Sequence, residues 1–355
     1  MIETLLGKKI VLVGGAGFVG HHLALALRQL GAGVEVIDSL QINNLGAFAG
    51  NEDNIPKRDL YLHLLQMRMR LLQDANIPLH ILDARDYHAL SPLMSHIKPD
   101  VVIQLAAVAH ASKANKNPYS TFDHSLRTLE NALDASRSLV KHFIYLSSSM
   151  IYGNFSDKLV TEESVAEPIG IYGALKFAGE KLVIAYNQVF GMPYTIIRPS
   201  ALYGERCVSR RVGQIFIENA LDGLSLTVHG TGEDALDFTY IGDFVSGIVK
   251  VITNDNAKNE ILNMTYGAAR SIKDLAAILN SEFGDLSIQY QPKDSLMPDR
   301  GTLSVEKARK LIGYDPQFPL ERGFVRYINW YKSLKDSEHG FFKGMTLPFP
   351  AKTAT

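Results

Sequence analysis

The stretch "KKIVLVGGAGFVG", residues 8–20, decides the fold. Its first half is apolar, rich in β-branched residues and closed by glycines, which is the pattern of a short buried strand. From Gly17 the sequence "GFVGHHLALALRQLGAG" carries apolar residues at helical spacing and stops at Gly31 and Gly33. The stretch therefore predicts a strand, a tight turn and a helix in direct succession.

Apolar runs of the same kind recur along the chain, with helical patterns between them. Fully apolar strands that alternate with helices indicate a parallel sheet covered on both faces, so the predicted fold class is α/β with a doubly wound parallel sheet. The further predicted strands lie in residues 34–39, 78–86, 99–109, 141–153 and 192–204.

The strand–helix rhythm loosens after Pro199, where glycines become more frequent and the runs shorter. We expect a first domain at 1–198, with a returning segment near 237–266. A smaller C-terminal α/β lobe is expected at 199–236 and 267–335, followed by a tail at 336–355. Residues 44–75 predict an extra helical arm with a solvated basic face, formed by Lys57, Arg58, Arg68 and Arg70.

Glycines at positions 14, 17 and 20 occupy the turn between the first strand and helix. The first allows a tight turn, the second lets backbone N–H groups approach a pyrophosphate, and the third permits close packing of helix on strand. Asp38 follows about twenty residues later at the end of the second strand, where a carboxylate accepts both ribose hydroxyls and repels a 2′-phosphate. This spacing predicts a dinucleotide site that prefers NAD to NADP.

Other strand ends offer weaker candidates for the same site. Asp83, after the third strand, is suited to an adenine edge, although an acid at that place can equally cap a helix. Ala106 and Ala107 leave room for the ribose and nicotinamide of the cofactor, or serve packing alone.

The sequence "IYGALK" places Tyr172 and Lys176 one helical turn apart. Such pairs occur by chance on amphipathic helices. Here the fifth strand delivers "SSSMIYG" to the same edge of the sheet, so a hydroxyl, a phenol and an ammonium converge there. Because an unperturbed phenol has a pKa of about 10, a neighbouring ammonium is needed for it to act as a base at neutral pH.

The amino-acid composition limits the classes of molecule that we expect this protein to bind. The chain has 355 residues and a net charge of −1, which gives no electrostatic reason to expect nucleic acid or an anionic membrane. The single cysteine, Cys207, excludes an intrachain disulfide and favours a reducing compartment. The N-terminus shows no signal-peptide pattern, so we expect a cytoplasmic protein, and no metal site is predicted.

Together these motifs resemble the extended short-chain dehydrogenases/reductases, in particular the nucleotide-sugar epimerase/dehydratase group. The resemblance runs through "GGAGFVG", "SSSMIYG", "YGALK", "RPSALYG", "LDFTYIGD" and "DRGTLSVEKARKLIGYDP". It implies a Rossmann-like fold with a smaller substrate lobe, NAD as cofactor and a nucleotide-diphosphate sugar as substrate. It also implies a homodimer in which the helices near 120–138 and 172–190 pair with their symmetry mates.

The resemblance assigns roles to single residues. Ser148 matches the catalytic Ser/Thr and Ser149 the next position, while Tyr172 and Lys176 match the Tyr-x-x-x-Lys pair. Pro199 matches the proline beside the nicotinamide, and Phe18 and Val19 belong to the cofactor turn. Arg300 matches the arginine that holds the nucleotide diphosphate, and Arg206, Arg210 and Arg211 are further candidates, each of which could equally be a surface charge.

The positions at which this chain departs from the family pattern indicate which of the family's reactions it resembles most. Dehydratases and decarboxylases carry an acid just after the catalytic Ser/Thr, where this chain has Ser149 and Met150. Leu236 replaces the arginine that commonly precedes "DF", and Ser125 replaces a frequent asparagine. The resemblance is best to a C4 epimerase; the alternatives are a nucleotide-sugar dehydrogenase or ketoreductase, and a non-catalytic NAD-binding protein.

Overall fold

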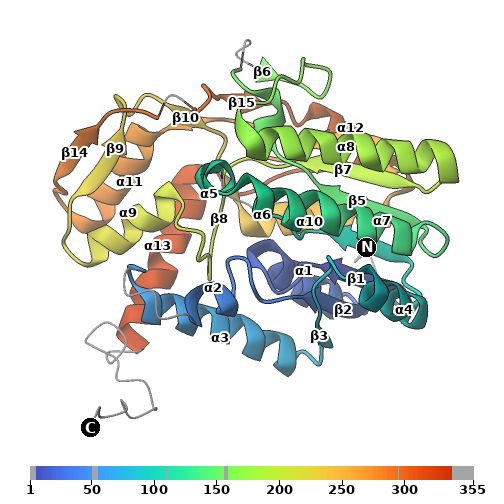
Figure 1. Ribbon diagram of the computed structural model, residues 1–355. Coiled ribbons are helices and arrows are strands. Elements are labelled where there is room, and N and C mark those ends of the chain that lie inside the picture. Colours follow the sequence, from blue (N-terminus) through green and yellow to red (C-terminus); the bar gives the residue numbers. More distant parts are fainter. Residues whose placement is uncertain (1–4, 50–54, 109–110, 156–158, 295, 338–355) are drawn as a thin grey trace, which may run out of the picture.

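The computed structural model describes residues 5–49, 55–108, 111–155, 159–294 and 296–337. Most of tail 336–355 and part of arm 44–75 lie outside these ranges. The centre of the molecule is a seven-stranded parallel sheet in the order β12-β7-β5-β4-β1-β2-β3 (Figure 1). Its strands are β1 (Lys9–Val13), β2 (Gly33–Asp38), β3 (Leu79–Ile81), β4 (Val101–Gln104), β5 (His142–Leu146), β7 (Tyr194–Arg198) and β12 (Glu260–Asn263).

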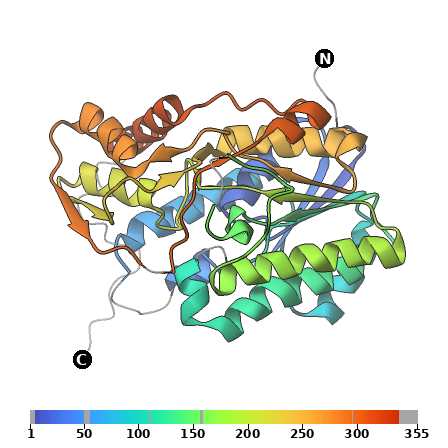
Figure 2. The same ribbon diagram turned by 90° about the horizontal axis from the view of Figure 1, so that it is seen from above.

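Helices cover both faces of this sheet, as the sequence predicts (Figure 2). Successive apolar side chains of β1 point to opposite faces of the sheet, so helices pack on both faces. Ile10 and Leu12 pack into one apolar cluster, with α1 and α10, whereas Val11 and Val13 pack into the other, with α4, α7 and α8. These helices are α1 (Phe18–Gln29), α10 (Ile241–Thr253), α4 (Tyr87–Ile97), α7 (Thr128–Ser136) and α8 (Gly170–Phe190).

Between β4 and α7 the chain forms α5 (Ala111–Lys116), α6 (Pro118–Phe122) and a π-helical segment, Asp123–Arg127. Three-residue and four-residue 3-10 turns lie at Asp255–Ala257 and Ser149–Tyr152. The predicted fifth strand is therefore shorter than expected. It ends at Leu146, and its "SSSMIYG" portion turns away at the sheet edge.

Most of the elements after β7, apart from α10 and β12, form a smaller group beside the carboxyl ends of the sheet strands (Figure 1). Two-stranded pairs β8–β11, β9–β14, β10–β13 and β6–β15 accompany helices α9, α11 and α13, whereas α12 packs beside β12 of the main sheet. Their bounds are β6 Leu159–Val160, β8 Leu202–Tyr203, β9 Leu226–His229, β10 Ala235–Leu236, β11 Thr239–Tyr240, β13 Arg270–Ser271, β14 Ile288–Gln291, β15 Thr302–Leu303, α9 Val212–Leu221, α11 Ile272–Phe283, α12 Glu306–Ile312 and α13 Leu320–Ser337.

The predicted arm after β2 contains α2 (Leu45–Ala49) and α3 (Arg58–Asp74). The prediction of a solvated basic face is wrong for Arg68, which is fully buried, and holds for exposed Arg70. Lys57 and Arg58 are half-buried, because Lys57 pairs with Asp222 and Arg58 donates to a backbone carbonyl. Charge spacing alone cannot show which side of a helix another segment covers.

Candidate active site

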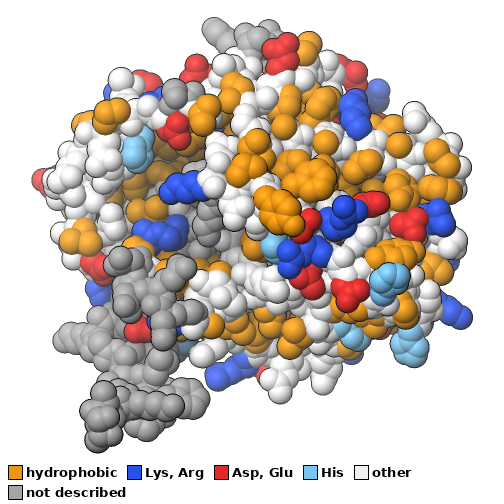
Figure 3. Space-filling view, viewed as in Figure 1, with side chains coloured by type: hydrophobic (Ala, Val, Ile, Leu, Met, Phe, Trp, Pro, Cys, Tyr) orange, Lys and Arg blue, Asp and Glu red, His pale blue; other side chains and the backbone are white. Residues whose placement is uncertain are grey.

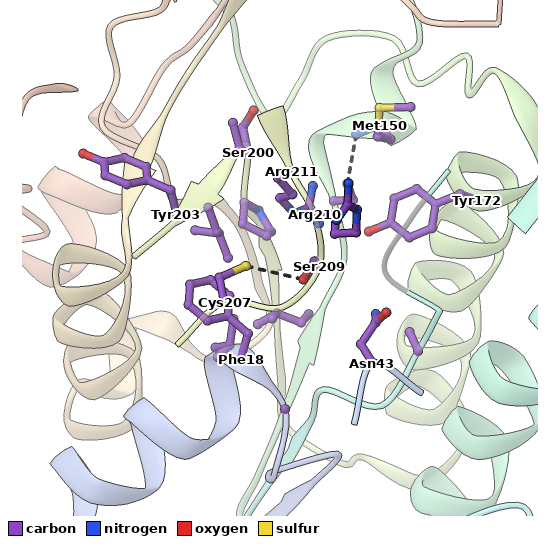
Figure 4. A pocket seen from close by; sticks show the side chains of 18 of the residues that line it. Phe18, Asn43, Met150, Tyr172, Ser200, Tyr203, Cys207, Ser209, Arg210 and Arg211 are labelled. Atoms are coloured by element: carbon purple, nitrogen blue, oxygen red, sulfur yellow. Dashed lines mark hydrogen bonds between the residues drawn. The ribbon is translucent and has the colours of Figure 1, made fainter. Parts of the chain in front are cut away.

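A cavity of about 730 Å³ lies at the carboxyl ends of the sheet strands and extends toward the smaller group of elements. Figure 4 shows its centre, with Phe18 and Cys207 on one side and Tyr172 of α8 on the other. The predicted site residues that line it are Gly14, Gly17, Phe18, Val19, Gly20, Asp38, Asp83, Ala106, Ala107, Ser148, Ser149, Tyr172, Lys176, Pro199, Arg210, Arg211 and Arg300.

The glycine turn is tightly constrained. Gly14 has φ +80°, and a Cβ there would lie 2.5 Å from the backbone N of Ala106 on β4's side. A Cβ at Gly20 would lie 2.4 Å from the carbonyl oxygen of Gly15, so the helix can pack this closely on the turn only without a side chain. Helix α1 begins at Phe18, directly after Gly17, and its N-terminus faces the cavity.

Asp38 ends β2 beside this turn. Its two carboxylate oxygens accept hydrogen bonds from the backbone N of Ala16, at 3.0 Å, and of Leu40, at 2.8 Å. Burial raises the pKa of Asp38, while these two bonds and the charge of Arg68 act in the opposite direction. The carboxylate is therefore fixed in place at the cavity wall.

Asp83 also lines the cavity, but its carboxylate is already engaged. Arg85 donates to it from Nη2 at 2.6 Å, and this bond lowers the pKa of Asp83. Ala106 and Ala107 line the cavity directly beside the glycine turn, where the backbone of Ala106 leaves no room for a Cβ at Gly14.

Two serines follow β5 at the cavity. Ser148 Oγ accepts a hydrogen bond from the backbone N of Met150 and caps the 3-10 turn. Ser149 Oγ is buried and has no hydrogen-bond partner among the described residues. Ser148 is 7% exposed and Ser149 1%, so Ser148 is the more accessible of the two.

Tyr172 and Lys176 lie in the first turns of α8. Figure 4 shows the Tyr172 hydroxyl pointing into the cavity, toward the side that carries Arg210 and Arg211. Lys176 is buried, donates from Nζ to the carbonyl oxygen of Leu146 at 2.5 Å and lies over the Tyr145 ring. Burial lowers the pKa of Lys176 to about 8, and Glu180 acts to raise it.

A buried ion pair beneath these residues was not predicted from the sequence. Arg198 donates to Glu180 from Nε at 2.9 Å and from Nη2 at 2.7 Å, and Ser147 donates to the same carboxylate at 2.5 Å. Glu180 lies one turn after Lys176, and Ser147 and Arg198 directly precede Ser148 and Pro199. The spacing of Lys176 and Glu180 was visible in the sequence, but their contacts with two strand ends were not.

The candidate arginines divide into two groups. Arg206 points away from the cavity lining, because its Nε donates to His21 Nε2 of α1 at 3.0 Å. Arg210 lines the cavity and donates to Tyr61 Oη at 3.0 Å, and Arg211 lies next to it (Figure 4).

Arg300 lines the cavity near Arg211 and Tyr172, and burial lowers its pKa to about 10. No hydrogen bond or salt bridge of its guanidinium is found within the described ranges. A half-buried cation in this setting is suited to an anionic group of a ligand.

Two negative observations apply to the described residues only. They contain no group of three or more His, Cys, Asp or Glu side chains placed to hold a metal ion. None of their helices is long and apolar enough to span a bilayer.

Comparison with known proteins gives consistent results. The family model described as "NAD dependent epimerase/dehydratase family" matches residues 10–265. An uncharacterized UDP-glucose epimerase of Bacillus subtilis is 28% identical over 93% of this chain and all of its own length. UDP-glucuronate 4-epimerase 6 of Arabidopsis thaliana is 27% identical over 92% of this chain and 72% of its own.

A solved structure extends the likeness to the whole fold. UDP-glucuronic acid 4-epimerase from Bacillus cereus, in complex with UDP-glucuronic acid and NAD, superposes with a TM-score of 0.81 at 25% identity. The match covers 92% of this chain and 100% of the other. The Rossmann-like α/β fold is thereby confirmed, and the chain belongs to the NAD-dependent epimerase/dehydratase family.

Proposed function

We propose that this chain is an NAD-dependent nucleotide-sugar epimerase that inverts C4 of the sugar through a transient 4-keto sugar. One observation carries the proposal. Ser148, Tyr172 and Lys176 line the same cavity as the glycine turn and Asp38, so a proton-transfer group faces the place of a dinucleotide. A protein that only sensed NAD would need the glycine turn and Asp38 but not these three side chains.

The residues present fit NAD. The space that a Cβ at Gly14 would fill stays open, and the N-terminus of α1 offers backbone N–H groups and a positive dipole end to a pyrophosphate. Asp38 faces the same cavity and can accept from ribose hydroxyls. NAD, when bound, would supply an acceptor for the C4 hydride and, in its reduced form, the donor that returns the hydride to the other face of the keto sugar after that sugar has turned.

The side chains supply the proton chemistry. Tyr172, as phenolate, takes the proton of the sugar hydroxyl when the carbon is oxidised and returns it when the carbon is reduced. Lys176 stabilises the phenolate by its charge, and the carbonyl of Leu146 fixes its ammonium. A serine hydroxyl donates to the same sugar oxygen. Ser148 is the first candidate for this role and Ser149 the second.

A nucleotide-diphosphate sugar is the proposed substrate. Leu236 cannot supply the charge that the family commonly places there, so Arg300, Arg210 and Arg211 are proposed to hold the diphosphate. We further propose a homodimer, a cytoplasmic location and the division into a domain at 1–198 and a substrate lobe at 199–236 and 267–335. The return of the chain to the sheet at β12 supports the assignment of 237–266 to the first domain.

The test is a conversion panel without added NAD. Purified protein is incubated with UDP-glucose, UDP-glucuronate and dTDP-glucose, each followed by NMR, with absorbance at the NADH band. The expected result is a C4 epimer mixture from at least one sugar and no accumulation of NADH. Oxidised sugar with stoichiometric NADH would instead establish a dehydrogenase, and bound NAD without any conversion would establish a binding protein.

A further inference from the structure

Arg68, in the middle of α3, is buried in a way that packing alone does not explain. Its exposed fraction is 0%. Nε donates to the carbonyl oxygen of Arg206 at 3.0 Å, and Nη2 donates to the same oxygen. Nη1 has no hydrogen-bond partner, and no carboxylate forms a salt bridge with Arg68 in the described part of the chain. A buried guanidinium with so few partners is costly, which points to a functional reason for it.

The segment that Arg68 holds, residues 204–211, is a strained loop. Arg206 has φ +60° and Arg210 φ +53°, a backbone region that side chains other than glycine rarely adopt. Helix α3 fastens this loop at both residues. Arg68 binds the carbonyl of Arg206, and Tyr61, also on α3, accepts from Arg210 Nη1. The arm thus sets the path of the loop that brings Arg210 and Arg211 to the cavity.

The contacts of Arg206 strengthen this arrangement. His21 donates from Nδ1 to the carbonyl of Gly17 and accepts at Nε2 from Arg206, so its ring is neutral. Burial lowers the pKa of His21, in agreement with that tautomer. The loop is therefore tied to α1, which starts at the glycine turn, as well as to α3.

Asp38 lines the same cavity as Arg68. Burial raises the pKa of the Asp38 carboxyl, and the charge of Arg68 acts against that effect, together with the two backbone hydrogen bonds that the carboxylate accepts. Arg68, Asp38 and Arg210 line one continuous cavity. One cation thus contacts the arginine loop and also acts by its charge on the proposed ribose site.

We propose that Arg68 is a positioning residue shared by two ligand sites. Its guanidinium holds the 204–211 loop for the nucleotide sugar, and it places a positive charge behind the Asp38 carboxylate for the adenine ribose of NAD. Helix α3 then links cofactor binding to substrate binding. The substrate half of this inference rests on the proposed function, whereas the cofactor half needs only family membership.

The experiment compares Arg68→Met with Arg70→Met, an exposed arginine two residues away on the same helix. Full-length protein is stripped of bound nucleotide, and its affinities for NAD and for UDP are measured separately by calorimetry. Arg68→Met is expected to weaken both at least tenfold, and Arg70→Met neither. Since no turnover is measured, failure of the epimerase proposal does not affect the NAD result.

Two further variants separate the roles. Arg68→Lys keeps the charge but loses the forked contact to Arg206, so NAD affinity should stay near wild type while UDP affinity falls. In an Asp38→Asn background, Arg68→Met should lower NAD affinity much less than in the wild type. Arg68→Met with both affinities equal to those of Arg70→Met would overturn the proposal. If Arg68→Met does not fold, unchanged UDP affinity in Arg68→Lys overturns it.

Discussion

At the residue scale, we expect Asp38 to decide the choice between NAD and NADP. A 2′-phosphate would meet its carboxylate, which two backbone N–H groups already fix at the cavity wall. Arg68 offsets only part of this repulsion, because its guanidinium is directed to the carbonyl of Arg206. We expect NAD to bind at least tenfold more tightly than NADP, a difference of about 1.4 kcal/mol or more.

Calorimetry with both cofactors measures this ratio. Asp38→Asn should bring the two affinities closer together, since the charge is lost while the size of the side chain is kept. Equal affinities in the unmodified protein would show that Asp38 does not face the ribose.

Glu180 governs the charge of Lys176. Burial lowers the pKa of Lys176 to about 8, and the Glu180 carboxylate raises it. Glu180→Gln removes that carboxylate and leaves the charge of Arg198 without a carboxylate partner, and both changes lower the pKa of Lys176 further. Lys176 lies over the ring of Tyr145, and burial raises the pKa of that phenol, so Tyr145 adds no charge beside the ammonium. The alkaline loss of turnover should therefore begin at lower pH in Glu180→Gln.

The measurement is a pH profile of kcat for Glu180→Gln beside Glu130→Gln, an exposed control. Glu180→Asp should restore much of the wild-type profile. If Glu180→Gln lowers the Tm but does not shift the alkaline limb of the pH profile, Glu180 has only a structural role.

The sequence predicts residues whose chemistry is local and misses those defined by contacts between segments. Gly14, Asp38, Tyr172 and Lys176 stand at fixed offsets from strand ends, so their meeting at one edge follows from the fold class. Arg68 was expected in solvent, because the helix pattern does not reveal that the loop after β8 covers it. The Glu180–Arg198 ion pair was missed for the same reason, because it joins α8 to the end of β7.

At the scale of elements, the β1–α1 turn can be tested with two glycines that share a left-handed backbone. Gly14 has φ +80° and Gly191 φ +67°, but only Gly14 has a neighbour, Ala106, where a Cβ would lie. Gly191→Ala should cost ~1–2 kcal/mol of stability and leave NAD binding intact. Gly14→Ala should cost more and abolish NAD binding.

Thermal unfolding with and without NAD distinguishes the two variants. NAD should raise the Tm of Gly191→Ala as it does for the wild type, and should not raise that of Gly14→Ala. A normal NAD-induced shift in Gly14→Ala would contradict the assignment of this turn to the cofactor.

The positions of the longer strands could be predicted from apolar runs in the sequence, whereas those of the two-residue strands could not. The six predicted strands correspond to β1, β2, β3, β4, β5 and β7. The two-residue strands, such as β6 and β15, pair segments far apart in sequence and are too short to show periodicity. Their pairing depends on where the sheet places their neighbours.

At the scale of the whole molecule, the proposed dimer concerns the face that carries α6, α7 and α8. Apolar side chains gather over α6 in Figure 3, where Tyr119 is 82% and Phe122 46% exposed. Val189, at the end of α8, is 71% exposed. Exposed apolar groups on adjacent helices favour burial against a second copy.

Sedimentation velocity at micromolar concentration should show a dimer. Phe122→Glu should shift it toward monomer, while Leu224→Glu, at a 55% exposed position of the smaller group of elements, should not. A monomeric unmodified protein would exclude this interface.

The central claim is that Tyr172 transfers the proton in a C4 epimerisation at a bound NAD. Its most direct test is kcat of Tyr172→Phe, on the sugar nucleotide that the wild type converts, beside Tyr186→Phe, a control on the same helix outside the cavity. Tyr172→Phe should keep its fold and NAD affinity and lose a factor of about 10²–10⁴ in rate, because only the proton-transfer group is removed. Tyr186→Phe should turn over normally. Near-wild-type turnover in Tyr172→Phe would contradict the account.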